Sequence, residues 1–98
     1  MLYLHRMELT SETLIARNTG ILANQVGNEV VMMDMEKGKY FGVNKTGSYI
    51  WQLLEQPATL GALCERLVTD FGISMEQCTA EVKAFVEQMQ KENIIAIQ

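Results

Sequence analysis

The hydrophobic positions of the first half of the chain follow the short, two-residue period of β-strands. Three runs rich in aliphatic or aromatic side chains are separated by glycine-containing turns, at residues 21–26, 29–35 and 39–43. Glycine and asparagine tolerate the positive φ that hairpin turns require. The run 29–35 is apolar on both faces, as expected of a strand that is covered on both sides or flanked by neighbours. The pattern predicts a small antiparallel meander, preceded by a further extended segment at 13–17.

From residue 44 onward the apolar positions recur with the period of an α-helix. Asn44 or Thr46 can cap a first helix, and Pro57 ends it. Thr59 then begins a second helix, whose apolar positions share one face: Leu60, Leu63, Cys64, Leu67, Val68 and Phe71. Gly72 supplies the left-handed residue that commonly ends a helix.

A third helix is predicted from the capping box of Ser74 and Gln77 to the region of Asn93, where it frays. Its apolar positions are Met75, Cys78, Val82, Phe85, Val86 and Met89. Strands followed by helices indicate an α+β fold. We expect a three-stranded antiparallel sheet followed by a three-helix bundle, arranged like a winged helix-turn-helix. One domain is expected over residues 1–98, with 1–12 as a loose N-terminal segment.

The composition limits the class of protein. A chain of 98 residues with 48% hydrophobic and 20% charged residues is typical of one ordinary globular domain. No apolar stretch approaches the ~18 residues of a membrane span, and residues 1–7 lack the features of a signal peptide. The two cysteines do not form a disulfide framework. A cytoplasmic protein with free thiols is therefore expected.

Few side chains could carry out catalysis or hold a metal. His5 is the only histidine, and no cysteine or carboxylate lies at ligand spacing from it, so we expect it at the surface. Cys64 and Cys78 fall on apolar helix faces and are expected to be buried, inert thiols. The glycines do not form a phosphate-binding loop. We therefore expect no enzymatic activity, no metal and no cofactor.

The charge argues against a nucleic-acid partner. Eight basic and twelve acidic residues give a net charge of −4. The third helix would be the recognition helix of a winged-helix protein, yet it carries four acidic and two basic residues: Glu76, Glu81, Glu87 and Glu92 against Lys83 and Lys91. Such a helix would repel a phosphate backbone. DNA binding stays only a minor alternative.

The run 39–43 is the last strand of the predicted meander and therefore has one free edge. Lys39 is its only charged residue, although charge or proline usually protects such an edge. Gly42 would let another backbone approach closely. We interpret this edge as open for strand addition by a peptide. Alternatively, Tyr40 and Phe41 are merely core residues, and one of them must point inward.

Residues Glu29 to Met89 resemble the PqqD-like domains, also called RiPP recognition elements. The family pattern has an acidic residue after an aliphatic strand, a glycine turn, an aromatic pair, a (Gly)-(Leu/Val)-Asn-x-(Thr/Val)-Gly step and an Ile-Trp-x-Leu-Leu helix. The matching residues are Asp34, Lys37-Gly38, Tyr40-Phe41, residues 42–47 and residues 50–54. The last helix of the family resembles residues 81–89, with Val86 and Met89 as conservative departures. The resemblance covers roughly residues 13–97.

The resemblance implies a non-catalytic protein that binds the leader segment of a ribosomally made precursor peptide. Such domains take the leader as an extra strand against the strand 39–43, in a groove walled by the third helix, and present it to a separate modifying enzyme. The implied groove residues are Lys39, Tyr40, Phe41, Gly42 and Val43 on the strand, and Cys78, Glu81, Val82, Phe85 and Met89 on the helix. The helix must also supply core contacts, so the division between core and groove stays open.

The segment 38–47 resembles the stand-alone leader-binding proteins of lasso-peptide pathways more than the pyrroloquinoline-quinone chaperone. A lasso-peptide protein would work with a cysteine-protease-like leader peptidase. The alternative is a chaperone that presents a precursor peptide to a radical SAM enzyme, in pyrroloquinoline-quinone or another peptide-modification pathway. A winged-helix DNA-binding regulator is the less favoured reading.

Overall fold

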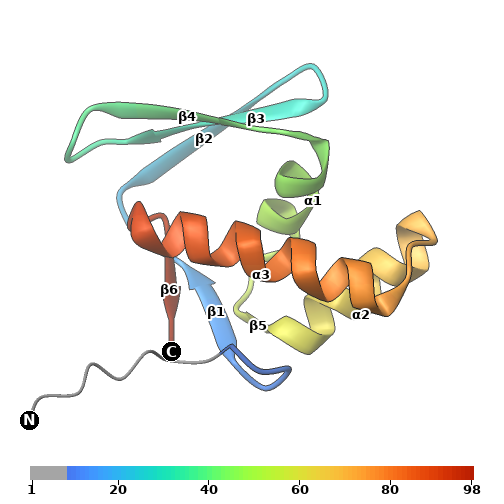
Figure 1. Ribbon diagram of the computed structural model, residues 1–98. Helices are drawn as coiled ribbons and strands as arrows, with labels where there is room; N and C mark the ends of the chain where they lie inside the picture. Colours follow the sequence, from blue (N-terminus) through green and yellow to red (C-terminus); the bar gives the residue numbers. More distant parts are fainter. Residues whose placement is uncertain (1–8) are drawn as a thin grey trace, which may run out of the picture.

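The computed structural model describes residues 9–98, which form an α+β fold of three helices and two small antiparallel sheets (Figure 1). The first sheet has the order β2-β3-β4, from Ile21–Val26, Glu29–Asp34 and Lys39–Val43. The second has the order β5-β1-β6, from Ala58–Thr59, Leu14–Arg17 and Ile95–Ile97. The helices are α1, Lys45–Leu53, α2, Leu60–Phe71, and α3, Met75–Lys91. The predicted meander and the three predicted helices are confirmed.

The meander is held in register by its two turns. Gly27 has a φ of 64° in the two-residue turn that follows β2, and Gly38 has a φ of 68° in the turn before β4. The carboxylate of Asp34 accepts hydrogen bonds from the backbone N–H groups of Glu36, at 3.0 Å, and Lys37, at 3.2 Å. This buried acidic side chain therefore stabilises the second turn, in the manner of an Asx turn.

Side-chain caps begin all three helices. The side chain of Asn44 accepts from the N–H of Gly47 at 2.9 Å, so Asn44 rather than Thr46 caps α1. Thr59 caps α2, and Ser74 caps α3 by accepting from the N–H of Gln77 at 3.1 Å. Each cap satisfies an N–H group that has no partner within its helix.

The second sheet was only partly expected, because β1 matches the predicted extended segment but β5 and β6 do not match any predicted element. Helix α3 ends at Lys91 with Glu92 as its C-cap, close to the expected end near Asn93. Asn93 has a φ of 64°, which turns the chain out of the helix and directs β6 back onto β1. Strands of two or three residues show no period of their own, and β6 pairs with residues about 80 positions earlier.

The expected loose N-terminal segment does not include all of residues 1–12. Leu9 is buried in the core, and Thr10 closes a turn with Thr13 through a backbone bond of 3.0 Å and a side-chain bond of 2.8 Å. His5 and the rest of residues 1–8 lie outside the described residues.

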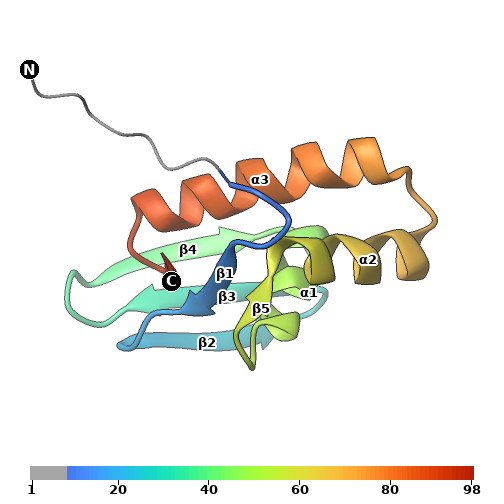
Figure 2. The same cartoon turned by 90° about the horizontal axis from the view of Figure 1, so that it is seen from below.

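The core lies between the two sheets and the helices. Its completely buried side chains include Ile15 of β1, Met32 of β3, Ile50 of α1 and Val82 of α3. Helix α3 runs alongside β4, on the core side of the first sheet (Figure 2). This placement leaves the β4 edge next to one flank of α3.

Candidate functional site

Strand β4 forms an edge of the first sheet, because no other described strand pairs with its far side. Along a strand, the backbone N–H and C=O groups of successive residues point to opposite sides. One backbone hydrogen bond of known direction therefore determines which residues of the strand point to each side. The N–H of Met35 donates to Gly20 at 3.0 Å, which directs the odd-numbered residues of β3 toward β2 and the even-numbered ones toward β4. The partners of the even-numbered residues on β4 are Val43, Phe41 and Lys39.

The buried hydroxyl group of Ser48, at the other end of the β3–β4 pair, indicates the same directions for these backbone groups. The Oγ of Ser48 accepts from the N–H of Val30 at 2.9 Å and donates to the carbonyl of Val43 at 3.3 Å. Val30 and Val43 are paired residues whose backbone groups face each other across this bridge. The N–H and C=O groups of Tyr40 and Gly42 consequently point toward the open edge.

Side chains alternate along the strand in the same way, and this decides which of Tyr40 and Phe41 points toward the core. Val43 is buried and Phe41 is half-buried against the core, whereas the side chain of Tyr40 is 72% exposed on the opposite face. Gly42 does not have a positive φ, and a Cβ atom at this position would meet no atom within 4 Å. The fold therefore does not require glycine there, and the backbone at Gly42 is uncovered.

A hollow of about 510 Å³ lies where the N-terminus of α1 approaches α3. Its accessible apolar surface comes from the half-buried ring of Phe85 and the exposed Ala84, and the completely buried Ile50 lies beneath them. The other lining residues are Asn44, Thr46, Gly47, Glu81 and Gln88. A Cβ atom on Gly47 would lie 2.7 Å from the ring of Phe85 and 3.3 Å from Val43. The absence of a side chain at Gly47 thus lets the ring of Phe85 lie close to the end of β4.

The structure separates the helix residues that were expected in the groove. Glu81 and Phe85 line the hollow. Cys78 and Val82 are completely buried, and Met89 is only 6% exposed, so these three side chains pack in the core. The hollow is lined on α3 by positions 81, 84, 85 and 88. The buried positions 78, 82, 86 and 89 form the neighbouring row on the helix surface.

Sequence reasoning missed the contribution of α1 to the hollow. Asn44, Thr46 and Gly47 lie in the Gly-Val-Asn-x-Thr-Gly step, and this step could have pointed to the hollow because it places a glycine at the start of a helix. Glycine is unfavourable inside a helix unless a close approach requires it. The ring of Phe85 supplies that reason here.

The family model for coenzyme PQQ synthesis protein D (PqqD) matches residues 29–95, which contain β3, β4, β5, all three helices and the start of β6. This chain belongs to the PqqD family. The expected resemblance is thereby confirmed. No curated protein sequence matches this PqqD-family protein.

Two solved structures are similar to this PqqD-family protein in fold. One is TbiB1 in complex with the TbiA(beta) leader peptide, with a TM-score of 0.77, 19% sequence identity, and coverage of 82% of this chain and 93% of that chain. The other is lasso peptide synthetase B1 complexed with the leader peptide, with a TM-score of 0.73, 17% identity, and coverage of 84% and 96%. At these identities the likeness shows the fold.

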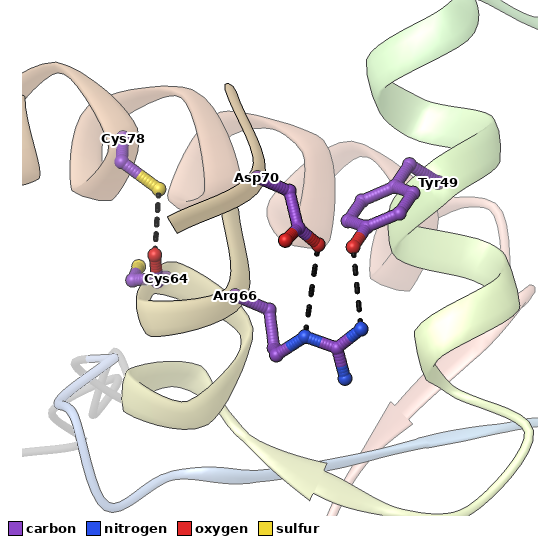
Figure 3. Close-up of polar contacts among 5 residues, drawn as sticks. All are labelled: Tyr49, Cys64, Arg66, Asp70 and Cys78. Atoms are coloured by element: carbon purple, nitrogen blue, oxygen red, sulfur yellow. Dashed lines mark hydrogen bonds and ion pairs between the residues drawn. The ribbon is translucent and has the colours of Figure 1, made fainter. Parts of the chain in front are cut away.

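The cysteines of this PqqD-family protein are buried between α2 and α3 (Figure 3). The thiol of Cys78 lies 3.5 Å from the carbonyl oxygen of Cys64. Burial, followed by the hydrogen bond and charge of Cys64, raises the pKa of Cys78 to about 11. A thiol with so high a pKa is protonated at neutral pH and is a poor nucleophile. Both cysteines are buried, as expected.

The described residues show neither a metal cluster nor a membrane span. Between Leu9 and Gln98, no three histidine, cysteine or acidic side chains come together in a way that could hold a metal ion. None of the three described helices is long and apolar enough to cross a membrane.

Proposed function

We propose that this PqqD-family protein binds the leader segment of a ribosomally synthesised precursor peptide and delivers it to a separate modifying enzyme, without catalysing a reaction itself. The observation that carries the proposal is the uncovered backbone of Tyr40 and Gly42, on an edge strand that lies beside the hollow at Phe85. The leader would add to the first sheet as a fourth strand, which is a recurring mode of peptide recognition. Both similar structures are complexes with leader peptides.

Main-chain bonds alone do not explain tight binding. Tyr40 and Gly42 offer two N–H and two C=O groups, and each bond stabilises the complex by a net ~0.5–1.5 kcal/mol. Ordering the backbone of the leader costs about 1–2 kcal/mol per residue. Burying an aliphatic or aromatic side chain contributes about 1.5–3 kcal/mol. We therefore infer that the leader places an apolar side chain into the hollow against Phe85 and Ala84.

The same edge and hollow carry little positive charge. Lys39 is the only basic residue of β4, and Glu81 lies at the rim of the hollow. The arrangement of the sheet and helices is, by our inference, that of a winged helix-turn-helix. However, the acidic exposed side of α3, with Glu76, Glu81 and Glu87, favours a peptide over DNA.

The pathway that we propose is lasso-peptide biosynthesis. One of the two similar structures is lasso peptide synthetase B1 complexed with the leader peptide, and the other is a leader-peptide complex of the same fold. A leader peptidase is then the enzyme that receives the peptide. Family membership by itself favours the second candidate, presentation of a peptide to a radical SAM enzyme of pyrroloquinoline-quinone type.

A titration with isotope-labelled protein tests the proposal. The probe is the leader peptide of the precursor encoded beside this protein's gene, and the control is the same peptide with its sequence scrambled. We expect saturable binding, with the largest amide shifts at Tyr40 and Gly42 and slower hydrogen exchange at both. Absence of binding, or shifts confined to residues away from β4 and α3, would contradict the proposal.

A further inference from the structure

The outward face of the first sheet, opposite the core, is apolar. Solvent-facing sides of antiparallel sheets normally carry polar side chains. On this face the outward residues of β2, β3 and the β3–β4 turn are mostly aliphatic, and β4 adds an aromatic ring: Leu22, Val26, Val31, Met33, Met35 and Tyr40. We call these six side chains the outer patch. Among the outward-facing residues of the three strands, only Glu29 is charged, and it lies at the hairpin end of β3.

The outer patch is accessible and hollowed. Leu22 is 50% exposed, Val26 is 61% exposed, and Tyr40 is 72% exposed. Together with Asn24, Val31 and Met33 they enclose a shallow hollow of about 300 Å³. An apolar surface of this kind, with Glu29 as the one charged outward residue of its three strands, is typical of a surface that another molecule covers.

The size of the face argues against a second copy of this chain as the occupant. Three strands about 4.8 Å apart and five or six residues long, at about 3.3 Å per residue, make a face of roughly 300 Å². A stable interface buries about 800 Å² on each partner. Two outer patches stacked on each other fall well short of this value.

The face is continuous with the β4 edge. Tyr40 and Gly42 direct their backbone groups to the edge and their side-chain positions to the outer face. A leader strand added to β4 would place every second side chain of its own on this same face. A partner that covers the outer patch would therefore also contact the bound leader, and its interface would extend beyond the three strands.

We propose that the outer patch is the docking surface for the modifying enzyme, which contacts the patch and the outward side chains of the bound leader together. This inference rests on the proposed function. The matching enzyme surface is apolar and uncharged, because a charge opposite the patch would be desolvated without a partner. The enzyme then binds the leader-loaded protein more tightly than the free protein.

Two lysine substitutions on the same strand test the proposal. Val26→Lys places a charge on the outer patch, whereas Gln25→Lys places the same charge on the opposite face of β2. Both positions are exposed, so both variants should fold, and β2 lies two strands away from the β4 edge. The probes are the leader peptide and the maturation enzyme encoded beside this protein's gene, titrated by calorimetry.

We expect both variants to bind the leader with wild-type affinity. Val26→Lys should weaken association of the leader-loaded protein with the enzyme about tenfold or more, and Gln25→Lys should leave it within about twofold. Normal enzyme association of Val26→Lys, and of Leu22→Lys as a second variant, would overturn the docking surface but leave leader binding intact. A wild-type dimer that Val26→Lys dissociates in sedimentation velocity would assign the patch to a second copy instead. Failure of the wild-type protein to bind the leader would overturn the proposed function.

Discussion

Proline substitution along β4 should separate loss of peptide binding from loss of folding with a two-residue alternation. Proline has no N–H group, so its effect depends on the direction in which the replaced N–H points. The N–H groups of Tyr40 and Gly42 point to the open edge, and those of Phe41 and Val43 point to β3. Proline at Tyr40 or Gly42 should therefore affect only the incoming peptide.

The magnitude follows from the number of bonds lost. Gly42→Pro removes one donor and leaves one carbonyl of the bound leader without its partner, which costs about 1–3 kcal/mol. That loss corresponds to roughly 5- to 150-fold weaker leader binding. Gly42→Ala keeps the N–H, and its Cβ atom meets open space, so it is the matched control with unchanged affinity. Tyr40→Pro provides a second edge variant should the backbone angles at Gly42 not suit proline.

Phe41→Pro should instead destabilise the fold. It removes the bond to Met32 and leaves a buried backbone group without a partner, at a cost of about 1–3 kcal/mol beyond the loss of the phenyl ring. Phe41→Ala loses the ring but keeps the N–H group. The difference in the free energy of unfolding between these two variants therefore measures the cost of losing the backbone hydrogen bond.

Circular dichroism melts measure the stability of these five variants, and leader titrations measure their affinity. Together they show whether loss of binding and loss of folding alternate along β4. Folded Tyr40→Pro and Gly42→Pro proteins that bind leader normally would show that β4 is not the docking edge. A stable Phe41→Pro protein would show that the assigned strand parity is wrong.

Further predictions concern the core, the hollow, the charge and the thiols. Met89→Ala should lower the free energy of unfolding by about 2–4 kcal/mol in urea titrations, with unchanged leader affinity of the folded protein, because Met89 is buried. Gly47→Ala should push the ring of Phe85 toward the hollow and weaken leader binding. Ala62→Ser, a small change at an exposed position of α2 away from the hollow, should not; equal affinities of the two variants would contradict the hollow. Leader affinity should change less than about threefold between ~50 and ~200 mM salt, and steeply salt-dependent binding of duplex DNA in the same assay would favour the regulator instead. The pKa of the Cys78 thiol is raised from its ordinary value of 9.0 to about 11. The protonated thiol therefore stabilises the fold below about pH 9, and this stabilisation is lost as the pH rises from 9 toward 11. Across this range the melting temperature should fall less for Cys78→Ala than for the wild type.

Local features of this protein could be predicted from the sequence because they depend on neighbouring residues. The caps at Thr59 and Ser74 and the left-handed Gly72 depend on backbone groups within four residues. The meander depends on two glycine turns and short apolar runs. The family could also be identified, since its pattern lies in the contiguous segment from Asp34 to Leu54 and in the third helix.

Which side of each element faces the core was decided by tertiary structure. Cys78, Val82 and Met89 share a helix with Glu81 and Phe85, and helical spacing alone does not say which row packs on α2 and which lies beside β4. The strand parity of Tyr40 and Phe41 was decided by the bridge of Ser48 between Val30 and Val43.

The sheet of β1, β5 and β6 likewise depends on contacts between distant parts of the chain. Its short strands become stable only when Ile15 and Ile95 are buried together in the core. Strands this short have no hydrophobic pattern from which the pairing could be predicted. The sequence thus determined the meander, the three helices, their order and the strand with a free edge. Only the packing of α3 against the sheets decided which backbone groups and side chains remain available at that edge, because burial depends on all the elements at once.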